Sequence, residues 1–219
     1  TSGRRALAAL AVAFAAATQA AEAGAPPTGG AGGPIILPAP KDFAGAVAAL
    51  ERATGVKGGA VELGGAEVPL SEGREFAVDG RTAERLLDGS HTAFRKAGLY
   101  LFRLERAFGL AGEKDPLVLL ATADRNAVVR RVGTGSPRDG VTTEKVVAWL
   151  DALAKEEPFE LTEVGVDYLR GRFERAPKDP VEVARRSVEL APGLVAGRAS
   201  TLILLAEEIR TARTLYLIW

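Results

Sequence analysis

The chain has 219 residues, of which 47% are hydrophobic, so it can bury the core of one good-sized domain or of two small ones. Its 28 basic residues are balanced by 28 acidic ones, which argues against nucleic acid as a partner because proteins that bind it usually carry a basic excess. The chain has no cysteine and one histidine, His91. Thiolate zinc sites, cysteine nucleophiles and multi-histidine metal sites are therefore excluded within one chain, and we predict neither a metal nor a cofactor.

The N-terminal residues 1–23 have the pattern of an export signal peptide. Arg4 and Arg5 precede an apolar run at residues 6–17, and the Ala-Glu-Ala sequence at 21–23 matches a cleavage site. The apolar run is shorter than the roughly 20 residues of a membrane span, although it could contact a membrane transiently. The alternative is an alanine-rich helix of the folded protein. We expect a protein that is periplasmic or secreted, or one that resides in a plastid lumen.

Residues 24–40 are predicted to be a linker, because glycine and proline dominate them. Ile35, Ile36 and Leu37 interrupt this composition and are expected to dock on the domain as a short extended segment. Residues 41–219 are predicted to form one globular α+β domain.

The first half of this domain is predicted to alternate short strands with helices. The strands are expected at residues 60–63, 67–70, 75–78, 99–104 and 116–122, where β-branched and apolar residues lie between turn residues. The helices are expected at residues 43–54, 81–87, 90–97 and 124–132. Asp42 and Asp124 are suitable N-caps, and for residues 124–132 we favour a helix over a strand.

The second half is organised around a helix that begins near Thr142 and ends before Pro158. Its residues Val146, Leu150 and Leu153 fall on one helical face, which we expect to pack on the strands that follow. Further elements are expected at residues 159–164 and 166–173 (strands), 180–191 and 200–210 (helices) and 215–219 (a closing strand). Asp179 is expected to cap the helix at 180–191, with Glu182 closing a capping box on it. The fold class predicted is therefore α+β, with helices packed on a mixed or antiparallel sheet.

Three blocks of the sequence are similar to a known bacterial family. They are residues 158–161 leading into 167–173 (Asp-Tyr-Leu-Arg-Gly-Arg-Phe), residues 177–180 (Pro-Lys-Asp-Pro), and residues 204–208 leading into the ending at 215–219. From about residue 99 to residue 219 the chain resembles a family known as a domain of unknown function (number forty-two fifty-three), in which the turn at 133–135 also has a counterpart. The resemblance implies a fold and little else.

Two departures from that family pattern affect polar residues. The family carries Cys-Pro-Asp where this chain has Ala-Pro-Gly at 191–193, and it tends to end in Trp-Trp-Asp where this chain has Ile218-Trp219. If those polar residues form a site in the family, this protein lacks part of it.

Thr134 and Arg138 are candidate binding residues. The glycines around Thr134 could direct backbone N–H groups towards an anion, and Arg130, Arg131 and Arg138 would add charge. The alternative, which we favour, is an ordinary polar turn with solvated arginines.

Asp167 is the third candidate. It lies in a strand-like run and would share a face with Leu169 and Phe173, where an acid is costly unless it is paired. We expect it to pair with Arg172 or Arg175, or else to mark a pocket.

No catalytic residue is predicted. His91 stands without an evident nucleophile or orienting acid, and we expect it to be solvated or to act as a cap in the first turn of a short helix.

Two functions remain open from the sequence. The leading one is an exported, non-catalytic binding or accessory protein with an unknown protein or small-molecule partner. The alternative is a small extracytoplasmic hydrolase that uses an acid such as Asp167. Convergence of Asp167, Arg138 and Thr134 in one pocket would favour the hydrolase.

We predict that exported protein begins at Gly24 or within a few residues of it, because the sequence at 21–23 fits the peptidase pattern. Intact-mass measurement of the exported protein checks this. Exported material that retains the residues before Ala21 would contradict it.

Overall fold

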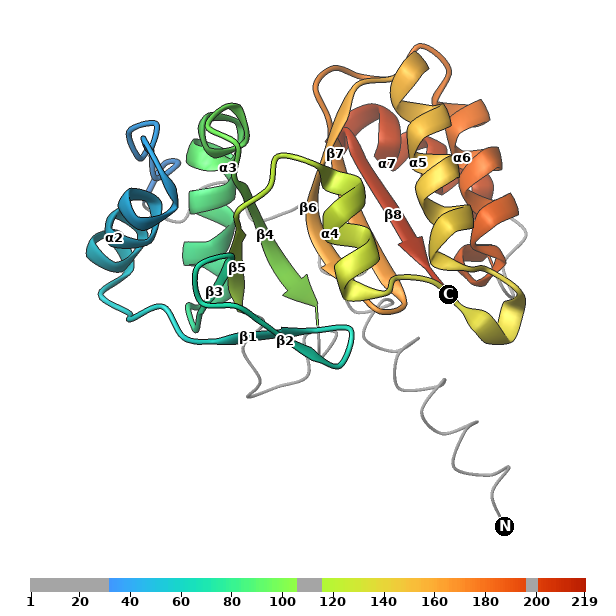
Figure 1. The fold of residues 1–219 in the computed structure, drawn as a ribbon. Coiled ribbons are helices and arrows are strands. Elements are labelled where there is room, and N and C mark those ends of the chain that lie inside the picture. Colours follow the sequence, from blue (N-terminus) through green and yellow to red (C-terminus); the bar gives the residue numbers. More distant parts are fainter. Residues whose placement is uncertain (1–31, 106–115, 196–200) are drawn as a thin grey trace.

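The computed structural model describes residues 32–105, 116–195 and 201–219. The expected signal peptide and the first part of the linker lie outside these residues. Within them, six strands form one sheet in the order β3-β5-β4-β6-β7-β8 (Figure 1). The strands are β3 (Gly73–Phe76), β4 (Tyr100–Glu105), β5 (Leu117–Leu120), β6 (Phe159–Gly165), β7 (Tyr168–Phe173) and β8 (Thr214–Ile218).

The sheet is mixed because β4 and β6, at its centre, run parallel while every other neighbouring pair is antiparallel. This confirms the predicted α+β class. A separate hairpin of β1 (Val61–Leu63) and β2 (Ala66–Val68) turns at Gly64-Gly65.

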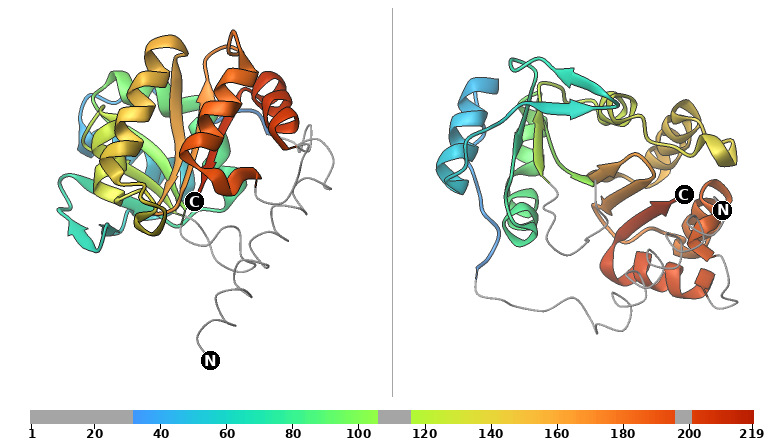
Figure 2. Two further views of the ribbon diagram at one scale, coloured as in Figure 1. Left: turned by 90° about the vertical axis from the view of Figure 1, so that its right-hand side faces the viewer. Right: turned by 90° about the horizontal axis from the view of Figure 1, so that it is seen from below.

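One face of β3, β5 and β4 is covered by α3 (Gly80–Lys96) and α2 (Phe43–Thr54), as Figures 1 and 2 show. The core on this side consists of fully buried side chains such as Phe76, Phe94, Leu101 and Leu117. The same face of β6, β7 and β8 carries charged and aromatic side chains, because alternation along each strand places Glu163 beside Arg103 and Arg170.

The opposite face of the sheet is covered by helices of the second half. They are α4 (Arg125–Val132), α5 (Thr143–Glu156), α6 (Pro180–Leu190) and α7 (Thr201–Ala212). Their buried side chains form one continuous core with the odd-numbered residues of β7 and β8 and with Phe102 and Leu104 of β4. This core crosses from β4 to β6 without a break.

The helix ends follow the predicted capping residues. The carboxylate oxygens of Asp42, Asp124 and Asp179 accept backbone N–H groups at the starts of α2, α4 and α6, which satisfies donors that have no partner inside the helix. Glu182 does not close a capping box on Asp179. It pairs instead with Arg185, one helical turn on, at 2.6 Å, because an (i, i+3) arginine lies within its reach.

The prediction of two helices at 81–87 and 90–97 is wrong, because α3 continues through both. Gly89 stays helical, and the backbone of Ile35 crosses it so closely that a Cβ there would lie 2.2 Å from the Ile35 oxygen. Ser90 donates to the C=O of Ile35 (2.8 Å) and accepts the N–H of Leu37 (2.9 Å). The Gly-Ser pair is thus a docking point for residues 35–37 and not a break in the helix, and the expected docking of that segment is confirmed.

Leu150→Ala is expected to lower the free energy of unfolding by about 2–5 kcal/mol. Leu150 is fully buried where α5 packs on the sheet, so truncation leaves a cavity. Urea unfolding measures the loss, with Lys155→Ala on the exposed side of α5 as the control, expected within about 0.5 kcal/mol of wild type. A loss below about 1 kcal/mol for Leu150→Ala would show that the site relaxes to fill the space.

Candidate functional site

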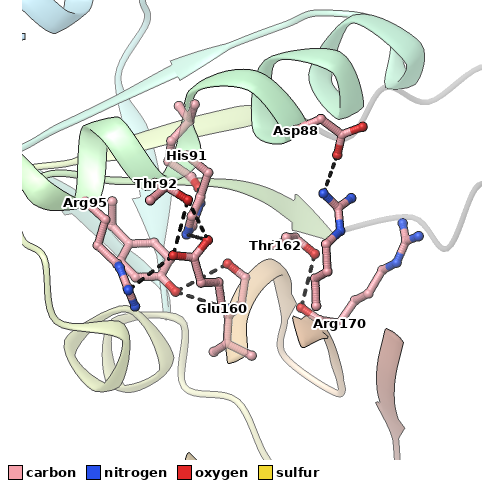
Figure 3. A network of polar contacts seen from close by, with 11 residues as sticks. Asp88, His91, Thr92, Arg95, Glu160, Thr162 and Arg170 are labelled. Carbon is pink, nitrogen blue, oxygen red and sulfur yellow. Dashed lines mark hydrogen bonds and ion pairs between the residues drawn. The ribbon is translucent and has the colours of Figure 1, made fainter. Parts of the chain in front are cut away.

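Polar side chains from α3 meet β6 on the face of the sheet where the apolar cover of α3 ends. His91, Thr92 and Arg95 lie on one side of α3 at helical spacing, and Figure 3 shows them converging on Glu160 of β6. We refer to these four residues as the α3–β6 contact.

Glu160 is the centre of this contact. Its side chain is 15% exposed. The hydroxyl of Thr92 donates to it at 3.2 Å, the guanidinium of Arg95 lies at 3.2 Å, and Nε2 of His91 lies at 3.5 Å. One carboxylate from β6 therefore lies against three side chains of a single helix, and the two that donate to it, Thr92 and Arg95, fix the position of α3 relative to that strand.

His91 is 2% exposed, so the expectation of a solvated or capping histidine is wrong. The residue lies in the interior of α3, because the two predicted helices are one. Its Nδ1 is 2.6 Å from the C=O of Leu101, and a carbonyl can only accept, so the proton of the neutral ring sits on Nδ1. Nε2 is then left as a buried lone pair that makes no hydrogen bond within the described residues.

The pKa of His91 is lowered, chiefly because burial disfavours the imidazolium. The carboxylate of Glu160 and the C=O of Leu101 oppose this shift, while Arg95 and Arg172 add to it. The ring is therefore neutral at neutral pH.

Tyr100 of β4 packs against His91 and so helps to position the α3–β6 contact. Its ring packs edge-on against His91, with 5.0 Å between the centroids. Its hydroxyl donates to the C=O of Leu161 (3.3 Å) and accepts the N–H of the same residue (3.2 Å). Burial raises the pKa of Tyr100, so the hydroxyl keeps its proton. The hydroxyl takes the place of a β4 backbone partner for Leu161, which precedes the register pairs of β4 with β6.

A second group of charges continues along the same face. The buried carboxylate of Glu163 lies between Arg103 of β4 (3.0 Å) and Arg170 of β7 (2.6 Å). Arg170 also reaches Glu84 of α3 at 3.6 Å. These pairs connect α3, β4, β6 and β7 through charge-assisted contacts.

The side chain of Thr134 is fully buried at the end of α4. Its hydroxyl donates to the C=O of Gly165 at 2.7 Å, and the N–H of Gly135 donates to the C=O of Val166 at 2.7 Å. The turn after α4 is thus held against the β6–β7 hairpin. The Thr134 hydroxyl is committed to that contact and does not point to solvent.

Asp167 lies in the turn between β6 and β7 and not within a strand, because two residues are needed to reverse the chain between these strands. Its C=O accepts the N–H of Trp219. Burial raises the pKa of its half-buried carboxyl. The expected pairing with Arg172 or Arg175 is not found within the described residues. Arg172 pairs instead with Asp88 of α3 at 2.5 Å.

Arg138 is exposed in the short 3-10 helix Pro137–Asp139. Of the other two arginines expected around an anion, Arg130 pairs with Glu144 and Arg131 with Glu72, each at 2.8 Å. The structure therefore places Thr134 against the hairpin that carries Asp167. Arg130 and Arg131, two of the three arginines expected to bind an anion, are engaged in ion pairs instead.

The α3–β6 contact was not found from the sequence. The available signal was weak: polar residues of α3 recur three or four positions apart, at Glu84, Asp88, His91 and Arg95, on a helix that is otherwise amphipathic. Nothing local to α3 indicates that they face β6 and β7.

Among the described residues, no group of three or more His, Asp or Glu side chains is placed to hold a metal ion. In the same parts of the chain, none of the helices combines the length and apolar character needed to cross a membrane.

These features define an α+β protein with helices on both faces of one mixed sheet and with a set of charges that are paired with one another. Residues 116–219 match the family model described as Domain of unknown function (DUF4253), which confirms the resemblance seen in the three sequence blocks. No curated protein and no solved structure matches the chain. The matched part contains Glu160, Glu163 and Arg170, whereas α3 with His91 lies before it.

The single histidine is expected to titrate below its usual pKa of 6.5, because burial is the largest influence on it. Its NMR signal is unambiguous in a chain with one histidine. Glu160→Gln should lower the pKa further, since the carboxylate is the main group that raises it. A titration at or above 6.5 in the folded protein would contradict the burial of the ring.

The same shift predicts the direction of the pH dependence of stability. The unfolded chain takes up a proton near pH 6.5 while folded His91 resists it, so its contribution is complete above that pH and is lost as pH falls through 6.5 towards the folded value. Urea midpoints of wild type and His91→Gln should therefore diverge less at pH 5 than at pH 7.5.

Proposed function

We propose that this protein is an exported, non-catalytic binding or accessory protein, and that its partner is another protein that docks on α6 and α7. The observation that carries the proposal is an apolar groove between these two helices. Export is proposed from the pattern of residues 1–23.

The groove has exposed apolar walls. It is lined by Pro180, Val181, Leu202, Ile203, Ala206, Glu207 and Arg210. Ile203 is 75% exposed and Val181 56%, and Leu204 beside them is also exposed. Large apolar side chains gathered around a groove mark a surface that gains free energy when a partner covers it.

The rim of the groove is charged. Glu207 and Arg210, which line it, pair with each other at 2.5 Å along α7. On α6, Glu182 follows the lining residue Val181 and pairs with Arg185 at 2.6 Å. An apolar floor between charged edges suits an amphipathic helix, whose apolar side chains enter the groove while its polar flanks meet the rim.

The polar side chains support a non-catalytic role. The hydroxyl of Thr92 is bound to Glu160, that of Thr134 to a carbonyl, and Nδ1 of His91 to another carbonyl. An activated nucleophile needs a hydroxyl beside a base that is free to take its proton. The carbonyls that accept from Thr134 and His91 cannot act as that base, and the carboxylate of Glu160 beside Thr92 is already ion-paired with Arg95 at 3.2 Å.

One observation favours the second function, a small extracytoplasmic hydrolase. Asp167 is half-buried with a raised pKa and has no ion pair within the described residues, which is the setting of a carboxyl that can hold a proton for transfer. Against this, the hydroxyl of Thr134, whose convergence with Asp167 would favour the hydrolase, donates to the C=O of Gly165 instead.

Ile203→Asp is expected to abolish partner binding, because a carboxylate in an apolar interface must lose its water. The protein is bound to beads and incubated with extract of its native source, and bound proteins are quantified by mass spectrometry. A partner of the wild type should fall by about tenfold or more with Ile203→Asp.

The control is Leu70→Asp, a matched change at an exposed leucine in the turn before β3. Both sites are exposed, so neither variant should change the urea midpoint appreciably. Equal retention of the partner by both variants would exclude the groove. Turnover by the purified wild type that is lost in Asp167→Asn would favour the hydrolase.

A further inference from the structure

Only a short stretch of backbone pairing, between β4 and β6, joins the half of the sheet made of β3, β5 and β4 to the half made of β6, β7 and β8. The parallel strands β4 and β6 share three register pairs, from Arg103 with Glu163 to Glu105 with Gly165. Towards the start of β6 the strands are joined instead through the hydroxyl of Tyr100. On the far face the apolar core is continuous across both strands, so any separation is confined to the side of α3.

On the side of α3, polar contacts hold the helix to β6 and β7. Thr92 and Arg95 bind Glu160, and Asp88 binds Arg172. The apolar side chains of α3 face β3, β4 and β5 instead. The adhesion of α3 to β6 and β7 therefore depends on charge state more than on buried apolar area.

His91 is the buried group within this contact that can take up a proton as the pH falls below neutral. Four titratable or charged side chains act on it: Arg95 from α3 itself, Tyr100 from β4, Glu160 from β6 and Arg172 from β7. The charge of Glu160 is already shared with Arg95 and Thr92. A proton on Nε2 would therefore add a positive charge beside two arginines, with a partly committed carboxylate 3.5 Å away.

We propose that the α3–β6 contact is an acid-sensitive joint, in which protonation of His91 at Nε2 favours a state with α3 lifted from β6 and β7. In the closed state the imidazolium is excluded from water by its burial. In the open state water solvates it. A proton, like any ligand, shifts the equilibrium towards the state that binds it better.

Lifting α3 from β6 and β7 also changes which charged side chains are exposed to solvent. Glu160 and Arg172 lose their partners on α3 and become accessible, which creates a charged surface on β6 and β7 at acidic pH. The groove between α6 and α7 lies on helices of the opposite face, so partner binding there is independent of this change.

Hydrogen exchange followed by mass spectrometry tests the proposal. The full chain is labelled at pH 7.5 and pH 5.0, with labelling times scaled for the intrinsic exchange rate at each pH. We expect protection to fall by about fivefold or more at pH 5.0 in the part of α3 around His91 and in β6 at Leu161, whose N–H is held by the Tyr100 hydroxyl beside His91, since each unit of pKa difference between two states is worth a factor of ten. Protection in β5 should not change.

Three variants complete the test. His91→Gln, which cannot be protonated, should remove the pH dependence of exchange in β6. Glu160→Gln should enlarge the acid response, because it removes the charge that stabilises the buried imidazolium. Asp88→Asn weakens the contact with Arg172 and should raise exchange equally at both pH values.

An unchanged pH response in His91→Gln would overturn the proposal, as would a wild type whose β6 exchanges equally at both pH values. Loss of protection in β5 together with β6 would show global acid unfolding and would overturn it as well. If His91→Gln fails to fold, Glu160→Gln decides the matter, because an acid response smaller than that of the wild type would overturn the proposal and a larger one would support it.

Discussion

The parallel pairing of β4 with β6 is the constraint on which the rest of the structure depends. It joins a half made of β3, β5 and β4 to a half made of β6, β7 and β8. The three register pairs are extended by the Tyr100 hydroxyl, which serves both backbone groups of Leu161. Without it these groups would be buried and unpaired, which costs more than a hydrogen bond gains. The position of Glu160 relative to His91 follows from this junction.

The two faces of the sheet are buried by different kinds of side chain. The α4–α7 face excludes water with one continuous apolar core, whereas the other face is apolar only beneath α2 and α3 and then becomes ionic over β6 and β7. Charges taken from water are tolerated there because each has a partner. The charged side chains of this face therefore stabilise the fold. The exposed side chains that are available to a partner are the apolar ones of α6 and α7.

Local signals in the sequence were sufficient for most elements. Asp42, Asp124 and Asp179 cap the helices that they were expected to cap, and the strands occur where apolar runs lie between turns. The failures share one cause: the deciding partner lies far along the chain. Gly89 remains helical because of Ile35, and Thr92 meets an acid 68 residues away. Thr134 and Arg138 were singled out by a glycine turn with arginines near it and Asp167 by strand alternation, and no local pattern indicated the α3–β6 contact.

The strand order determines which fragments of this protein can fold on their own. The residues that match the family begin at 116 and so include β5, but β5 lies between β3 and β4, and β4 separates it from β6. A fragment of residues 116–219 would keep β5 without either neighbour and would expose the edge of β6 that β4 covers. The family boundary is therefore not a folding boundary in this chain, and the smallest autonomous unit has to include β3, α3 and β4.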